Sequence, residues 1–212
     1  MKKVLVFMLL LVIGLSAMAQ QSIRLRSVDK AECEKSDMVS LKASFSFSTI
    51  DAQDMQTERG LFSSISIPNT VIGGNEGDPQ IPVLNELIAV PFGANPSIEI
   101  TSYTTTDYSL DDYGIHTLMP RQPNVFKNED NPFVYNEDAY QSTRGLRSKP
   151  MARVSVNGTM RGVRVGQLSI EPVSYDPVNN TLRVFNNIEV TVSFDGADAR
   201  ATEDMLVKTY SP

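Results

Sequence analysis

Apolar and polar side chains alternate along much of the chain, and this pattern predicts β-strands. From residue 39 to residue 48, serine or lysine stands at every even position and an apolar residue at every odd one: Val39, Leu41, Ala43, Phe45 and Phe47. A period of two is typical of a strand that buries one face. A similar run spans residues 61–67, and further short strands are expected at 87–90 and 98–102.

The last third of the chain predicts a long β-hairpin. Apolar residues alternate between 163 and 170, but their phase changes across Gly166-Gln167, where a β-bulge would insert one residue. The segment 176–180 (DPVNN) is a strong turn signal. From 182 to 194 the even positions are apolar, and Asn186 is the only polar exception.

The order of these patterns predicts an all-β fold. No window of 12 residues keeps a helical period of 3.6, although residues 201–210 could form a short helix or a tether. Many short strands separated by turns favour an antiparallel β-sandwich or jelly roll. We expect a signal peptide at 1–19, a flexible arm at 20–38, a single sandwich domain at 39–200 and a C-terminal tether at 201–212.

The first 19 residues have the pattern of an export signal. Two lysines precede an uncharged run from 4 to 15, and Ala17-Met18-Ala19 supplies the small residues that signal peptidase reads, so Gln20 would begin the exported chain. The run is too short for a transmembrane helix, although a retained anchor is the alternative. A lipid anchor would need a cysteine at the cleavage point, and Cys33 lies well downstream. We expect export to the periplasm, the cell surface or the medium, without a stable membrane anchor.

Composition and charge narrow the function classes. The 212 residues carry a net charge of −6, and removal of the two signal lysines leaves 17 basic and 25 acidic residues, a net charge of −8. An acidic chain is disfavoured as a nucleic-acid binder. One cysteine and one histidine argue against an internal disulfide, a Cys/His zinc site and a Cys–His catalytic pair. No nucleotide-binding or hydrolase motif occurs, so we expect no metal, cofactor or catalytic residue.

Residues 119–150 lack periodicity, and a long irregular stretch is either a functional loop or a disordered one. Six basic residues with no acid among them begin in this stretch and continue beyond it: Arg144, Arg147, Lys149, Arg153, Arg161 and Arg164. They form either an ordinary solvated face or a surface that docks against an acidic protein.

Four separated segments resemble one protein family. They are GDPQIPVLNELIAVPFGANPSIEI, LMPRQPNVFKNEDNPFVYN, GTMRGVRVGQLSIEPVSYDPVNNTLRV and NNIEVTVSF, and together they are similar to the prodomains of gingipain-type cysteine peptidases. The likeness is strongest to lysine-specific members, runs from about residue 44 to the C-terminus, and keeps the order of the motifs.

The resemblance implies a β-sandwich that folds ahead of a Cys-His peptidase domain, assists its folding and export, and keeps it latent. In that family a basic residue on a long prodomain loop enters the S1 pocket of the peptidase. The matching position here is Lys127, flanked by Phe126 and Asn128, and Arg121 is the runner-up. A lysine in a closed acidic pocket makes charge-assisted hydrogen bonds and buries its methylene stem. The alternative for Lys127 is an ordinary exposed loop lysine.

Other functions stay open at this point. Because the chain stops at Pro212, we expect it not to be the peptidase itself but a separated prodomain, a truncated precursor or a stand-alone inhibitor. The rival from another class is a carbohydrate- or protein-binding sandwich module. Such a module would use aromatic side chains, and five tyrosines cluster near the irregular region: Tyr103, Tyr108, Tyr113, Tyr135 and Tyr140.

Overall fold

The computed structural model describes residues 21–124 and 132–210, with side chains as far as residue 207. The predicted signal peptide and its cleavage point at Ala19 and Gln20 lie outside the described residues. The strands are β1 (Gln21–Arg24), β2 (Lys30–Ser36), β3 (Ser40–Ser46), β4 (Thr49–Thr57), β5 (Gly60–Ser66), β6 (Thr70–Gly73), β7 (Ile81–Ala89), β8 (Asn95–Ser109), β9 (Met151–Met160), β10 (Val163–Glu171), β11 (Val173–Asp176) and β12 (Thr181–Asp195). The helical elements are η1 (Leu110–Tyr113), α2 (Glu137–Tyr140) and α3 (Ala199–Tyr210).

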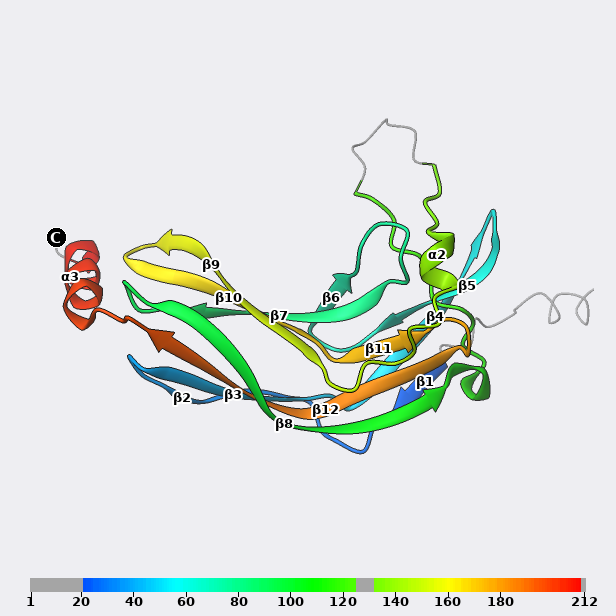
Figure 1. Cartoon of the computed structure of the whole chain (residues 1–212), viewed down its shortest axis with the longest axis horizontal. Helices are drawn as coiled ribbons and strands as arrows, with labels where there is room; N and C mark the ends of the chain where they lie inside the picture. The colour runs from blue at the N-terminus through cyan, green and yellow to red at the C-terminus, as the bar shows by residue number, and fades with distance from the viewer. Residues whose placement is uncertain (1–20, 125–131, 211–212) are drawn as a thin grey trace, which may run out of the picture.

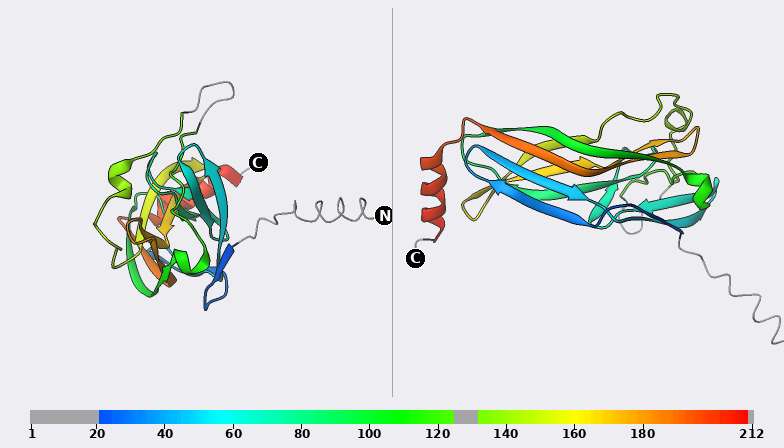
Figure 2. Two further views of the ribbon diagram at one scale, coloured as in Figure 1. Left: turned by 90° about the vertical axis from the view of Figure 1, so that its right-hand side faces the viewer. Right: turned by 90° about the horizontal axis from the view of Figure 1, so that it is seen from below.

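The strands form an elongated, sandwich-like body, as the alternating sequence predicts (Figure 1). One layer has the strand order β6-β7-β10-β9, and the other has the order β11-β12-β3-β2, with β8 paired along β12. A small sheet of order β1-β4-β5 extends one end, and α3 crosses the opposite end (Figure 2). The named strands pair antiparallel throughout, so the predicted all-β class is confirmed.

The core lies between the layers and uses the positions that the alternation predicts. Leu41, Ala43, Phe45 and Phe47 of the first alternating run are all buried, while Val39, just before β3, remains exposed. The even positions of β12 point into the same core, as do Leu168 and Ile170 of β10. Within its layer, β12 pairs with β8 along one edge and with β3 and β11 along the other.

The segment that we expected to be a loose arm forms two strands instead. Ile23 of β1 is fully buried opposite Ile50 of β4, and Leu25 joins the same core. All seven residues of β2 are exposed, because β2 is an edge strand that pairs with β3 through its backbone. An edge strand that exposes both faces to solvent has no alternation of apolar and polar residues, so its sequence does not predict a strand.

The predicted long hairpin is wrong in its pairing. β11 and β12 do form a hairpin around the 176–180 turn, but β10 pairs with β7 and β9 in the other layer. The irregularity beside Gly166 is real, yet the extra residue is Asn157, on the neighbouring strand β9. A Cβ atom on Gly166 would lie 2.8 Å from Val90 Cγ2 and 2.9 Å from the Ser155 carbonyl oxygen, so only glycine lets the strands approach this closely.

Of the two alternatives for the C-terminal segment, the structure has the helix, α3. Its start is fixed to the β7–β8 connection, because the Asp198 N–H donates to the Phe92 carbonyl at 2.7 Å and the Thr202 hydroxyl accepts from the Phe92 N–H at 3.0 Å. No helix in the described residues is long and apolar enough to cross a membrane.

Asp37 closes the turn between β2 and β3 and carries a pH-dependent prediction. Its Oδ1 accepts from the N–H groups of Val39 and Ser40, each at 2.8 Å, and its Oδ2 lies 2.8 Å from Lys35 Nζ. The Lys35 ammonium and these two amides lower the pKa of Asp37 to about 2. Because the folded pKa is lowered, the stabilising contribution of the carboxylate is present above its usual pKa and is lost as the pH falls toward 2.

We therefore expect the carboxyl carbon of Asp37 to titrate in the NMR spectrum with a midpoint near pH 2, together with the amide signals of Val39 and Ser40. In Lys35→Met the midpoint should rise, because the ammonium group is gone. A midpoint near the ordinary value of 3.8 in the wild type would show that these bonds do not persist in solution.

Candidate functional site

The irregular segment is built around a loop whose two stems are held together by one side chain. Gln122 Nε2 donates to the Val134 carbonyl at 3.0 Å, and the Val134 N–H donates to Gln122 Oε1 at 2.9 Å. The amide side chain thus pairs with the backbone of Val134 in the way a neighbouring strand would. The described stems on either side of residues 125–131 are therefore held together, and the span between them is called the 123–133 loop. The predicted plug Lys127 and its neighbours Phe126 and Asn128 belong to this loop but lie outside the described residues.

The turn between β6 and β7 anchors both stems to the sheet layer. The Arg121 N–H donates to the Asp78 carbonyl, and the Gly77 N–H donates to the Arg121 carbonyl, both at 2.8 Å. From the other stem, the Asn136 N–H donates to the Gly77 carbonyl at 3.0 Å, and its side chain donates to Asp78 Oδ1 at 2.7 Å. Gly77 has a φ of +81°, and a Cβ there would lie 3.0 Å from the Asn136 nitrogen, so a larger residue would disturb this junction.

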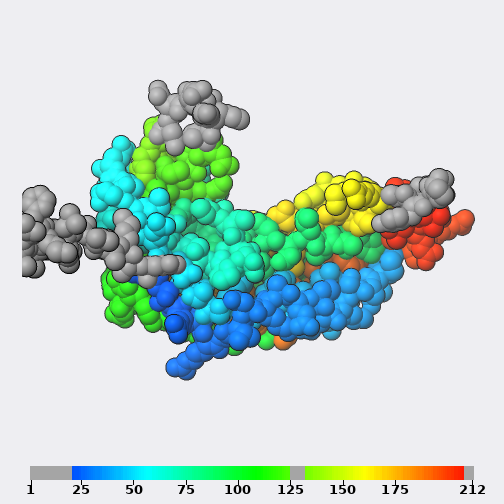
Figure 3. All heavy atoms as spheres, turned by 180° about the vertical axis from the view of Figure 1, so that it is seen from behind, coloured from blue at the N-terminus to red at the C-terminus, as the bar shows by residue number. Residues whose placement is uncertain are grey.

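An aromatic cluster fixes the same stems against the β4–β5 hairpin. The ring of Phe62 on β5 lies 6.1 to 6.4 Å from those of Phe133, Tyr135 and Tyr140, and the two tyrosine rings stack at 4.4 Å. The Tyr140 hydroxyl donates to the Leu118 carbonyl at 2.7 Å, and burial raises the pKa of this phenol well above its usual range. The described stems and the hairpin project together from the body (Figure 3).

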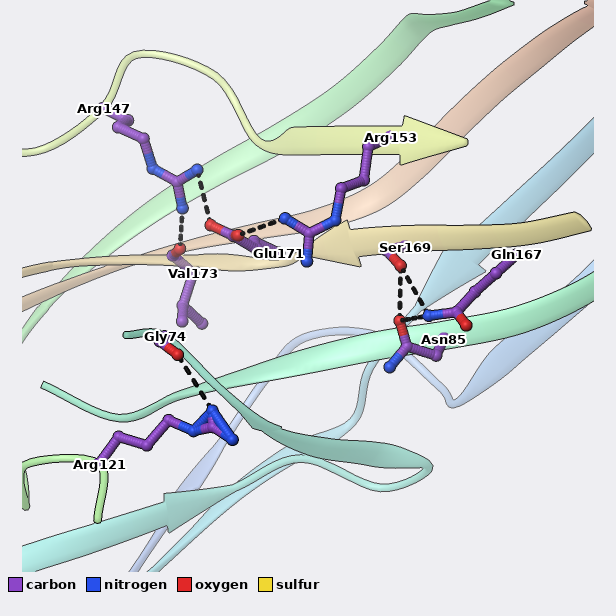
Figure 4. A network of polar contacts seen from close by, with 9 residues as sticks. All are labelled: Gly74, Asn85, Arg121, Arg147, Arg153, Gln167, Ser169, Glu171 and Val173. Atoms are coloured by element: carbon purple, nitrogen blue, oxygen red, sulfur yellow. Dashed lines mark hydrogen bonds and ion pairs between the residues drawn. The ribbon is translucent and has the colours of Figure 1, made fainter. Parts of the chain in front are cut away.

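The runner-up residue Arg121 lies in the anchored part of the stem. Its Nη1 donates to the Gly74 carbonyl at 3.1 Å, so the guanidinium points back toward the β6–β7 turn (Figure 4). Both backbone groups of Arg121 are also bonded to that turn. This geometry favours an anchoring role for Arg121, and the insertion of Lys127 into a partner stays a prediction.

The six basic residues of the predicted docking surface do not gather on one face. β9 separates Arg144, Arg147 and Lys149 at one end from Arg161, which occupies the β9–β10 turn at the other (Figure 1). A strand of this length extends over about 30 Å. A run of like charges in the sequence therefore becomes two separate groups in space.

Several of these cations also have partners within the chain. Arg147 and Arg153 lie 3.1 and 3.7 Å from the two oxygens of Glu171, and Arg147 also donates to the Val173 carbonyl (Figure 4). Arg164 Nη1 donates to the carbonyls of Pro91 and Ala94 at 2.9 and 2.6 Å. These contacts tie neighbouring segments together. In the described part of the chain, the charged groups of Arg144, Lys149 and Arg161 have no such partner.

The stem contacts predict a measurable loss when Gln122 is shortened. Gln122→Ala leaves the backbone groups of Val134 without their partner and also removes the bond to the Pro120 carbonyl. We expect the free energy of unfolding to fall by about 1–2 kcal/mol, measured by urea denaturation. Gln56→Ala is the matched control, because among the described residues its amide bonds only to the neighbouring Thr57 carbonyl, and it should stay within about 0.5 kcal/mol of wild type. Equal losses in the two variants would contradict the clamp.

Comparison with known proteins places almost the whole described region in one family. A family model described as Propeptide_C25 matches residues 23–208. Lys-gingipain of Porphyromonas gingivalis is 40% identical over 217 residues, which cover 100% of this chain and 12% of that protein. Gingipain R1 of the same species is 24% identical over 184 residues, covering 85% of this chain and 18% of that protein. The chain thus spans only a small part of the curated relatives it matches.

Two solved structures have the same fold. A structure described as giving insight into the zymogenic latency of gingipain K from Porphyromonas gingivalis superimposes with a TM-score of 0.78 and 42% identity, over 84% of this chain and 100% of the other. A complex of the pro- and mature domains of RgpB from the same species gives a TM-score of 0.63 over 84% of this chain and 95% of the other. At 19% identity the second likeness concerns the fold alone.

Proposed function

The chain belongs to the Propeptide_C25 family, and from this membership we propose that it is an exported propeptide that keeps a gingipain-type cysteine endopeptidase latent and assists its folding. The observation that carries the proposal is the match to Lys-gingipain over the full length of this chain, together with the likeness to a structure concerned with zymogenic latency. The peptidase would be a separate domain or chain, because the matched family describes a propeptide.

The finer part of the proposal is that the 123–133 loop inserts Lys127 into the S1 pocket. The stems of the loop support it, because Gln122 and the Gly77 junction fix where the loop leaves the body. A loop with fixed ends loses less conformational entropy on binding, which favours tight inhibition. A lysine matches a pocket that selects lysine, and its ammonium would bond to an acidic group inside that pocket.

The unpartnered cations Arg144 and Lys149 support a further contact beside the loop. They follow α2 along the chain, at the same end of β9 as the loop stems, so they would meet the partner near the rim of its cleft. Exposed rim charges mainly raise the rate of encounter and fix register. Arg161, at the other end of β9, would take no part in this contact.

The proposal is tested by adding the chain to a mature Lys-gingipain and following cleavage of a lysine-containing peptide substrate. We expect saturable inhibition that disappears when the chain is first denatured. Trypsin is the control peptidase, because it also cleaves after lysine but would not meet the rest of the propeptide surface. Absence of inhibition at micromolar concentrations, or equal inhibition of trypsin, would overturn the proposed function.

A further inference from the structure

A polar cavity lies on the side of the molecule opposite the described loop stems. It has a volume of about 620 Å³ and lies between the β1–β2 connection, β8 and β12. In Figure 1 this connection passes beneath the ribbons of β12 and β8, whereas the loop stems rise above the body. The side chains that give the cavity its character are Arg24, Arg26, Thr104, Thr106, Tyr108 and Tyr113. The proposed peptidase contact uses none of them.

The charge of the cavity is unusual for an acidic chain. Arg24 and Arg26 line it, and within residues 21–124 and 132–207 neither guanidinium has a hydrogen bond or an ion pair with another residue. No aspartate or glutamate lines the cavity, although the whole chain has a net charge of −6. The carboxylate of Asp107, on β8, is bonded to Arg183 at 2.7 Å through both of its oxygens. Two unpaired arginines at one cavity favour an anionic ligand.

An irregularity in β12 builds the polar floor of the cavity. The register with β8 shifts between Asn186 and Glu189, and Asn187 between them has a φ of +48°. Asn187 Nδ2 donates to the Thr104 hydroxyl at 3.2 Å, and the Ser27 hydroxyl donates to Asn187 Oδ1 at 3.3 Å. Bulges of this kind redirect side chains and are common beside binding sites. Here the bulge connects the β1–β2 connection to β8 through a chain of polar groups.

Two tyrosines form a wall beside these polar groups. The rings of Tyr108 and Tyr113 meet edge to face with their centroids 6.0 Å apart, and both line the cavity. A tyrosine offers an apolar ring face and a hydroxyl in one side chain. Such a surface suits a ligand that has both C–H faces and hydroxyl groups.

We propose that this cavity binds an acidic saccharide, one that carries carboxylate, sulfate or phosphate groups. The two arginines would bind its anionic groups, the hydroxyl and amide side chains its sugar hydroxyls, and the tyrosines its ring faces. The volume is in the range of pockets for organic ligands and exceeds what a single inorganic anion needs. An acidic peptide is the less favoured occupant, because the lining has only Leu25 and Val184 as aliphatic side chains to receive apolar peptide residues.

The test is calorimetric titration of the full chain with a sulfated, heparin-derived tetrasaccharide. Maltotetraose serves as the neutral probe, inorganic sulfate as the free anion and hexaglutamate as the acidic peptide. We expect the sulfated tetrasaccharide to bind and the other three to bind at least about tenfold more weakly. The double variant Arg24→Gln/Arg26→Gln should weaken tetrasaccharide binding about tenfold or more. Arg161→Gln/Arg200→Gln removes the same charge from exposed positions elsewhere and should change it less than about twofold.

Each contrary outcome overturns the proposal. Equal weakening by the two double variants would mean that the tetrasaccharide binds by overall charge and not in the cavity. Binding of hexaglutamate as tight as that of the tetrasaccharide would make the ligand an acidic peptide, and binding of sulfate as tight as the tetrasaccharide would leave a simple anion site. No binding of any probe ends the proposal. The single variants Arg24→Gln and Arg26→Gln, both at exposed positions, keep the test valid if the double variant unfolds.

Discussion

Replacing Lys127 with alanine is expected to raise the inhibition constant of the chain against a mature Lys-gingipain about 100-fold. A hydrogen bond to a charged group contributes about 1.5–3 kcal/mol, and each buried methylene adds about 0.8 kcal/mol. Loss of about 3 kcal/mol corresponds to that factor, because each 1.4 kcal/mol is tenfold in affinity. The measurement is steady-state inhibition with a peptide substrate that is cleaved after a lysine.

Two variants of other cations control this result. Lys42→Ala removes an exposed lysine of β3 that takes no part in the proposed contact, and Arg121→Ala removes a guanidinium that is bonded to the Gly74 carbonyl. Both should change the inhibition constant by less than about threefold, in the range of ordinary surface substitutions. Equal constants for wild type and Lys127→Ala would remove the plug role and would leave inhibition by docking of the propeptide surface intact.

Replacing Asn186 with leucine should give the largest loss of stability among the polar positions of the core. Asn186 is 8% exposed, and its amide donates to the Phe47 carbonyl and accepts from the Phe47 N–H, both at 2.9 Å. It also accepts from the Asn187 N–H at 2.9 Å. Leucine would leave these backbone groups without a partner, each at a cost of about 1–3 kcal/mol. We expect the free energy of unfolding to fall by about 3 kcal/mol in urea denaturation.

Asn157→Leu is the matched control for this change. Asn157 is the exposed extra residue of β9, and its side chain makes two long, exposed contacts: it accepts from the Ser155 hydroxyl at 3.2 Å and donates to Gln167 Oε1 at 3.4 Å. The same substitution there should alter stability by less than about 0.5 kcal/mol. If Asn186→Leu were as mild as Asn157→Leu, the buried amide would not hold β3 and β12 together.

The strands that could be predicted are those with one buried face. The alternating residues of β3 and β12 face the core on one side and water on the other, so apolar and polar side chains alternate along each strand. Asn186 interrupts the row of β12 because its amide replaces a strand partner just beyond the end of β3. The edge strand β2 could not be predicted, since backbone pairing with β3 leaves no mark on its side chains.

The sequence also could not predict that the chain changes layer between β10 and β11. Both segments are apolar enough to pair with β12, and the choice depends on β7 and β9, which are distant in the sequence. The resemblance to a family indicated the position of Lys127, but not what holds its loop. Gln122, Gly77 and Asn136 meet only in three dimensions, although the turn-rich segment 73–82 marks where the junction forms.

The basic residues between 144 and 164 illustrate the same limit. A sequence shows that like charges are close along the chain, but an extended strand carries them about 3.3 Å further apart with each residue. It also cannot show that Glu171 lies between Arg147 and Arg153. Partners from distant segments decide which cations remain available to another protein.

The most direct measurement is the structure of the chain bound to a mature Lys-gingipain. The account predicts that the 123–133 loop enters the active-site cleft and that Lys127 Nζ lies within about 4 Å of a carboxylate in the S1 pocket. A complex in which this ammonium group lies in solvent, with the cleft empty or filled by another segment, would contradict it.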